Sequence, residues 1–215
     1  MATARPLREG DSYTVWPGEP HKAPGPEAPP PDQSRAEPGS PPPEPRRSVE
    51  VAALARVQGA LCAEPVVQAA RGLSLFGEHA AGWFAAGLVG AAVDRGRRRD
   101  WLIGAGGVVA AHAASIAVKR VVRRQRPIDE SVEVRVSTPS SLSFPSSHAT
   151  STTAAAVLYS GLTGRNLVPA LVPPMLVSRL VLGVHYPTDV LAGSALGAAV
   201  GGLVRRGLRN RRRAR

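Results

Sequence analysis

Three short clusters between residues 119 and 189 combine basic, hydroxyl and imidazole side chains. A phosphoryl group in transfer spreads negative charge over its oxygens, so a catalyst must hold several donors around it. Two of the clusters also contain a histidine, which can attack or transfer a proton. The sequence therefore indicates a site that binds and attacks a phosphate. The clusters are Lys119 with Arg126-Pro127, then Pro145-Ser146-Ser147-His148, and then Ser178-Arg179 with His185 and Asp189.

Basic residues of the first and third clusters are the candidate phosphate ligands. We expect Lys119 at the end of a long apolar helix, Arg126 in the loop after it, and Arg179 near the end of a later helix. Basic residues at a helix end more often solvate the terminus or contact lipid headgroups. We expect that simpler role for the neighbouring Arg120, Arg123 and Arg124.

The second cluster predicts the start of a helix. A proline-stiffened entry leads into free backbone N–H groups that can bind an anion, and Ser146 can cap this helix or donate its hydroxyl. His148 would lie in the first turn and face the same anion. Taken alone, an ordinary N-cap is the better explanation of this cluster.

The third cluster also predicts the start of a helix, because Pro187 suits a first helical position. Asp189 would then accept the ring N–H of His185 and leave the other ring nitrogen free to attack. Ordinary helix capping also explains Asp189. It does not explain why Arg179 and His185 accompany it in an apolar setting.

Apolar runs predict the helices that position these clusters. The longest uncharged run, residues 101–118, is the best transmembrane candidate. The number of such runs and their basic flanks favour a membrane-embedded bundle over a soluble Ala-rich one. Because successive helices alternate in direction, all three clusters should meet at one end of the bundle. The expected helices are 65–76, 80–93, 101–120, 149–164, 166–178 and 190–204, with a loop at 127–145.

Proline and glycine add two local expectations. Pro169, Pro173 and Pro174 should kink or break the helix that contains them. The spacing of Gly193, Gly197 and Gly201 puts them on one helical face, where they let a neighbouring helix approach closely.

Composition indicates one folded domain with two tails. The 215 residues are 43% hydrophobic but only 4% aromatic, with 22 Gly, which suits close-packed helices. Residues 1–46 hold 13 of the 21 prolines and no signal-peptide core, so we expect a disordered Pro-rich tail whose partner the sequence does not identify. An amphipathic helix is expected at 47–64 and a basic tail at 206–215.

The three clusters together resemble the type 2 phosphatidic acid phosphatase (PAP2) superfamily, which shares its core with vanadium haloperoxidases and bacterial acid phosphatases. The family pattern is Lys-x6-Arg-Pro, Pro-Ser-Gly-His and Ser-Arg-x5-His-x3-Asp, and every spacing is matched. One residue differs from the family pattern: Ser147 stands where the pattern has glycine. It retains the backbone donor and adds a side chain that can narrow the pocket.

The resemblance covers about residues 65–205 and implies an all-α, membrane-embedded bundle of about four to six helices. It implies His185 as the nucleophile that forms a phosphohistidine, Asp189 as its orienting partner and His148 as the acid for the leaving oxygen. No metal or cofactor is implied. The residues that would hold the phosphoryl oxygens are Lys119, Arg126, Ser146, Ser147 and Arg179.

Within the superfamily, residues 142–153 and 184–187 resemble the actinobacterial decaprenylphosphoryl-5-phosphoribose phosphatases. This implies hydrolysis of a lipid phosphate monoester in the synthesis of the cell-wall arabinan precursor. Phosphatidate and polyprenyl diphosphate remain alternative substrates, and haloperoxidase or phosphotransferase chemistry remains an alternative for the same site.

The formal charge of +11 allows a different kind of function, the binding of anionic lipid or nucleic acid without catalysis. The scarcity of aromatic residues to stack on bases argues against nucleic acid.

Arginines flank the end opposite the three clusters, which makes that end cytoplasmic and the site extracytoplasmic by the positive-inside rule. His112 and Ser115 are expected to hydrogen-bond within the bundle, and Glu78 and His79 to form an interfacial turn.

Overall fold

A computed structural model describes residues 48–214, in which the regular secondary structure is entirely helical. The all-α prediction is confirmed. The Pro-rich tail predicted at residues 1–46 lies outside the described residues. The helices are α1 (Val49–Ala60), α2 (Glu64–Gly77), η2 (Glu78–Ala80), α3 (Ala81–Val93), η3 (Arg95–Arg97), α4 (Arg98–Val122), α5 (Ser147–Thr163), α6 (Val168–Val181) and α7 (Pro187–Arg213).

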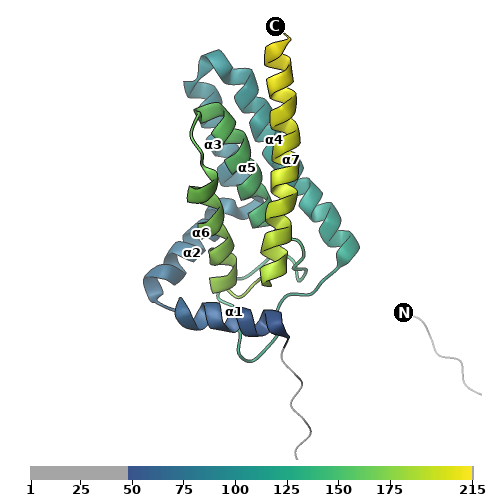
Figure 1. The fold of residues 1–215 in the computed structure, drawn as a ribbon. Coiled ribbons are helices and arrows are strands. Elements are labelled where there is room, and N and C mark those ends of the chain that lie inside the picture. Colours follow the sequence, from purple (N-terminus) through teal and green to yellow (C-terminus); the bar gives the residue numbers. More distant parts are fainter. Residues whose placement is uncertain (1–47, 215) are drawn as a thin grey trace, which may run out of the picture. The chain divides into compact units, whose positions relative to one another are not determined.

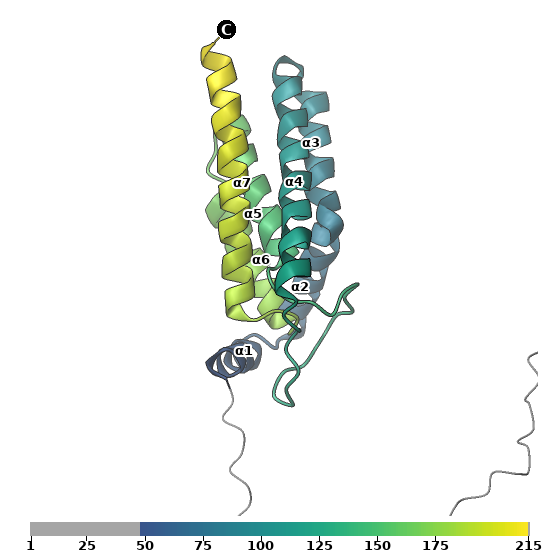
Figure 2. The same cartoon turned by 90° about the vertical axis from the view of Figure 1, so that its right-hand side faces the viewer.

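Helix α5 lies at the centre of the bundle, with α4, α6 and α7 packed against it and α3 packed on α4 (Figure 1). Most of its side chains are buried, and most of those are Ala, Ser or Thr. Small side chains let neighbouring helices come close, which compensates for the few large apolar residues in the chain. Helix α1 instead lies across one end of the bundle (Figure 2).

The tightest packing joins α5 to α7, through the predicted row of glycines. A Cβ atom at Gly193 would lie 2.5 Å from the Ser146 carbonyl oxygen, and one at Gly197 would lie 2.2 Å from that of Thr150. Any larger residue would separate the two helices. The glycine spacing therefore holds the start of α7, which carries Asp189, against the start of α5.

The larger side chains form a core between α3, α4 and α5. Trp83, Trp101 and Tyr159 are buried together there, and the Trp101 and Tyr159 rings lie 5.3 Å apart. Their polar atoms are paired, since Trp83 Nε1 donates to Thr152 Oγ1 at 2.9 Å and the Tyr159 hydroxyl donates to the Trp83 carbonyl at 2.7 Å. This core joins α3 and α4 to α5.

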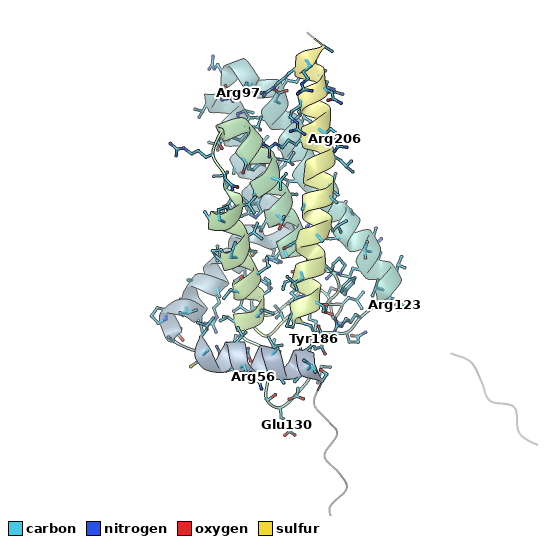
Figure 3. All side chains as sticks on the ribbon, viewed as in Figure 1. Arg56, Arg97, Arg123, Glu130, Tyr186 and Arg206 are labelled. Carbon is cyan, nitrogen blue, oxygen red and sulfur yellow. The ribbon has the colours of Figure 1, made fainter. Side chains whose placement is uncertain are left out.

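Helices α4 and α6 end where α5 and α7 begin, so the alternation expected from the sequence is present. In Figure 3 Tyr186 and Arg123 lie at this end, whereas Arg97 and Arg206 lie at the opposite end. Residues 95–122 and α7 are long and apolar enough to cross a membrane, judged by length and composition, and α6 is a shorter apolar helix.

Two local expectations are corrected. Pro173 and Pro174 do not break α6, because the carbonyls that lose a hydrogen-bond donor belong to exposed residues in the first turn of that helix. The arginines after Val204 do not begin a separate tail, because α7 continues through them to Arg213. One of them, Arg212, pairs with Asp100 at the start of α4 with an N–O distance of 2.6 Å.

Gly197→Ala should destabilise the protein by about 1 to 3 kcal/mol, because its methyl group overlaps the α5 backbone. Gly202→Ala on the same helix is the matched control, since a Cβ there meets no atom within 4 Å. The control should be neutral or stabilising by up to about 1 kcal/mol. Thermal unfolding in detergent, followed by circular dichroism, measures both; equal stability of the two variants would contradict the packing described here.

Candidate active site

A cavity of about 330 Å³ lies at the end of the bundle where the predicted clusters meet. Two of the predicted residues, Ser146 and Asp189, are buried behind its wall. The others line it directly: Lys119, Arg126, Ser147, His148, Arg179 and His185. Residues from α4, α5, α6 and two loops thus converge on one space large enough for a phosphate and part of its leaving group.

The two ring nitrogens of His185 face different groups, and Nδ1 makes no hydrogen bond to the described residues. Nε2 lies 3.4 Å from Arg126 Nη1, and because a guanidinium can only donate, Nε2 must be the acceptor. The ring proton is then on Nδ1, which lies 3.5 Å from Asp189 Oδ2. Asp189 Oδ2 also accepts from the Tyr186 N–H at 2.8 Å, which fixes the carboxylate. The lone pair that could attack is therefore on Nε2, and attack would require that its 3.4 Å contact with Arg126 be given up.

Electrostatics keep His185 neutral. Burial, together with the charges of Arg126, Arg179 and Lys119, holds the pKa of its imidazole well below the usual 6.5. A neutral imidazole near pH 7 retains the lone pair that a nucleophile needs.

Two of the three cations are held in place by backbone carbonyls. Arg126 donates from Nε to the Ser140 carbonyl at 2.8 Å and from Nη1 to the Val184 carbonyl at 2.6 Å. Burial lowers the pKa of Arg126 to about 10, so it stays charged at neutral pH. Lys119 Nζ donates to the Leu142 carbonyl at 3.0 Å. These carbonyls fix the positions of the two charges without neutralising them.

Arg179 is the third cation and is bound differently. Its side chain is only 1% exposed, yet its Nε and Nη1 have no hydrogen-bond partner among the described residues. Buried donors without acceptors are costly and are found mainly where a ligand supplies the acceptor. A phosphate oxygen in the cavity would be that acceptor.

The start of α5 supplies the remaining predicted residues. Ser146 caps the helix, and its Oγ accepts from the Ala149 N–H at 3.4 Å. Ser146 is therefore a structural cap, and it supports the anion site without lining the cavity. His148 Nε2 donates to the Ser74 carbonyl of α2 at 2.9 Å, which leaves its Nδ1 as the nitrogen that can exchange a proton.

Ser147, at the position where the family pattern has glycine, pairs with α4. Its Oγ lies 2.8 Å from Ser115 Oγ, which in turn lies 2.7 Å from the His112 carbonyl. Because a carbonyl can only accept, the Ser115 proton belongs to that bond, and the Ser147 hydroxyl donates to Ser115. The Ser147 hydroxyl therefore offers only lone pairs to the cavity, and its backbone N–H is the group suited to a phosphate.

The three clusters lie within the part of the chain that matches a known protein family. Residues 100–213, more than half of the chain, match the PAP2 superfamily. The chain belongs to the PAP2 superfamily. It is similar to the decaprenylphosphoryl-5-phosphoribose phosphatase of Mycobacterium tuberculosis H37Rv, with 54% identity over 156 residues, which cover 72% of this chain and 88% of that protein. The enzyme of the same name from Mycolicibacterium smegmatis is 57% identical over 145 residues, covering 67% and 81%.

The PAP2 fold is also present in a solved structure, that of a transmembrane PAP2 type phosphatidylglycerolphosphate phosphatase from Bacillus subtilis. The two chains superpose with a TM-score of 0.60 at 21% identity, over 77% of this chain and 89% of the other. This similarity concerns the fold. Together with the two apolar helices, it indicates that this PAP2 chain is associated with a membrane.

Two parts of this PAP2 site were not recognised in the sequence. Arg124, for which we expected contacts at a helix end or with lipid, instead donates from Nη1 to Asp189 Oδ1 at 3.1 Å and pairs with Glu50 of α1. Local sequence contains no signal for this contact. The other missed part is a polar wall of the cavity formed by Glu78, His79, His112, Arg120 and the loop 137–140.

Arg179→Met should stabilise the fold but weaken the binding of phosphate. Removing a buried charge without a partner should raise the free energy of unfolding by about 1 to 3 kcal/mol. Losing charge-assisted bonds to phosphate should weaken its binding about 10- to 100-fold. Phosphate-dependent shifts in Tm measure both effects, with Arg165→Met, an exposed arginine beyond α5, as the control. Unchanged phosphate affinity in Arg179→Met would contradict its assignment as a phosphate ligand.

Proposed function

We propose that this PAP2 protein hydrolyses the phosphate monoester of decaprenylphosphoryl-5-phosphoribose through a phosphohistidine on His185. The observation that carries the chemistry is a buried imidazole, His185, in one cavity with Lys119, Arg126 and Arg179. The substrate is proposed from the names of the two mycobacterial relatives.

In the first step, His185 Nε2 forms a bond to phosphorus while the bond from phosphorus to the ester oxygen breaks. To give that leaving oxygen a proton from Nδ1, His148 must first become an imidazolium, because its Nε2 proton is held by the Ser74 carbonyl. Burial and the charge of Arg179 lower the pKa of His148 to about 3, so the bound phosphate would have to supply the negative charge that raises it again. Asp189 stabilises the positive charge that develops on the His185 ring. The charge on the phosphoryl oxygens would be stabilised by Lys119, Arg126 and Arg179.

In the second step, water gives a proton to His148 Nδ1 and attacks phosphorus. The bond between phosphorus and His185 Nε2 then breaks, which releases inorganic phosphate and restores both histidines. Among the described residues no group of three or more His, Cys, Asp or Glu side chains is placed to hold a metal ion. The cations of the site supply charge stabilisation in the places where a metal would otherwise act.

The polar wall of the cavity supports a sugar phosphate as the substrate. The loop 137–140 presents Ser137, Thr138 and Ser140, whose hydroxyl or backbone groups can bond ribose hydroxyls. Arg120 and His112 stand on the α4 side of the same cavity. A second phosphate, the diester that joins ribose to the lipid, could pair with the positive charge of Arg120.

We also propose that the protein is a multi-pass protein of the plasma membrane with an extracytoplasmic site. Arginines gather at the end away from the cavity, on η3 and the last turns of α7 (Figure 3). The positive-inside rule makes that end cytoplasmic. Part of the positive charge at the cavity end is explained by phosphate binding, so the charge difference between the ends favours this orientation.

Purified protein should release inorganic phosphate from polyprenylphosphoryl-ribose phosphate in preference to phosphatidate or polyprenyl diphosphate, with chelator present. His185→Ala should lower kcat by about 10³-fold or more, because the nucleophile is lost. The wild-type protein should form an acid-labile, base-stable phosphoenzyme that this variant does not form. Preference for another lipid would overturn the substrate, and phosphoenzyme formation by His185→Ala would overturn the mechanism. Binding of anionic lipid with no turnover would favour the non-catalytic alternative.

A reporter phosphatase that is active only outside the cytoplasm should be inactive when fused after Arg215. The same reporter inserted after Glu130, in the exposed loop at the cavity end, should be active. Reporter activity in whole cells measures both fusions. The reverse pattern would show that the site faces the cytoplasm.

A further inference from the structure

Asp189 is held from two sides, and only one of them is His185. Its Oδ2 faces the imidazole and the Tyr186 N–H, while its Oδ1 accepts from Arg124 Nη1 at 3.1 Å. Asp189 is fully buried, so its orientation depends on protein contacts and not on water. Arg124 lies outside the cavity lining, behind the carboxylate.

Arg124 is itself held tightly, although it lies beyond the end of α4 in a loop. Its Nη1 donates to Thr188 Oγ1 at 2.7 Å, and its guanidinium carbon lies 4.0 Å above the centre of the Tyr186 ring. The Ser143 N–H donates to the Arg124 carbonyl at 2.7 Å, which fixes the backbone. The side chain has little freedom to leave Asp189.

The last partner of Arg124 comes from α1. Glu50 pairs with Arg124 Nη2 and also accepts from the Thr188 N–H at 3.3 Å, at the start of α7. A carboxylate beside the first N–H groups of a helix is well placed electrostatically. Glu50 therefore joins α1 both to α7 and to the arginine behind the site, and it lies outside the residues that match the PAP2 superfamily.

We propose that Arg124 and Glu50 are positioning residues for the reaction at His185, acting through Asp189. This inference rests on the proposed phosphohistidine chemistry. The four side chains form a row, Glu50, Arg124, Asp189 and His185, in which negative and positive charges alternate once the imidazole becomes cationic during attack. Arg124 aims the carboxylate at Nδ1 and keeps it from rotating.

Glu50 has a separate task in this row. An arginine with no other anion would compete with His185 for the charge of Asp189. Because Glu50 also pairs with the Arg124 guanidinium, Arg124 neutralises less of the negative charge of Asp189. More of that charge is then available to stabilise the imidazolium. Lys119, Arg126, Arg179 and His148 face His185 from the cavity side, where the phosphate would bind, and so do not replace this support.

Arg124→Gln and Glu50→Gln should each lower kcat for a phosphate monoester by about 10- to 100-fold, as is usual when the support of a reacting group is lost. KM should not change, because neither residue lines the cavity. Matched controls with the same charge changes are Arg56→Gln, exposed on α1, and Glu130→Gln, exposed in the loop, and both should keep wild-type kcat. Unchanged kcat in Arg124→Gln would overturn the proposal.

A double-mutant cycle separates positioning from a general effect on folding. In an Asp189→Asn background, Arg124→Gln should cause no further loss of kcat, because it acts through that carboxylate. A full additional loss in that background would show that Arg124 acts elsewhere. If Arg124→Gln does not fold, Arg124→Lys, which keeps the charge but loses the paired geometry, is used in the same cycle. An inactive wild-type protein would contradict the proposed function and not this inference alone.

Discussion

The structure depends on keeping three cations and an imidazole together around one cavity. Arg179 and His185 are 1% and 2% exposed, and like charges so close oppose folding. Backbone carbonyls of fixed loops hold Lys119 and Arg126, and the row of glycines presses α7 onto α5. Rigid packing thus maintains a cluster of positive charge that a bound anion would make more favourable.

Much of this arrangement could be predicted because its signals are local. Helix starts at Ser146 and Pro187 follow from capping and proline rules, and apolar runs mark the helices between them. Alternating helix directions then bring Lys119, His148 and Arg179 to one end without knowledge of any contact. Helix α6 continues through Pro173 and Pro174, where a kink or break was expected, because the carbonyls that these prolines leave without a donor belong to exposed residues. Whether those residues are exposed cannot be read from the local sequence.

The contacts behind the site could not be predicted in this way. Glu50 and Arg124 are 74 residues apart, and each has ordinary neighbours in the sequence. Arg120, Arg123 and Arg124 look equivalent as a basic helix end, yet only Arg124 meets Asp189, because the chain turns at Arg123 with a positive φ of 55°. A backbone turn of this kind decides which of several identical side chains reaches Asp189, and no local pattern marks it.

Ser147 shows how one departure from a family pattern can be absorbed by the fold. Its hydroxyl proton is committed to Ser115, whose own proton is committed to the His112 carbonyl, so α4 and α5 are joined at the cavity wall. The lone pairs left on Ser147 repel an oxyanion that comes close to its side chain. On the proposed chemistry, a phosphate would bind nearer to Arg126 and Arg179, the side on which His185 Nε2 lies. The added side chain would then favour an approach of phosphorus toward the proposed nucleophile.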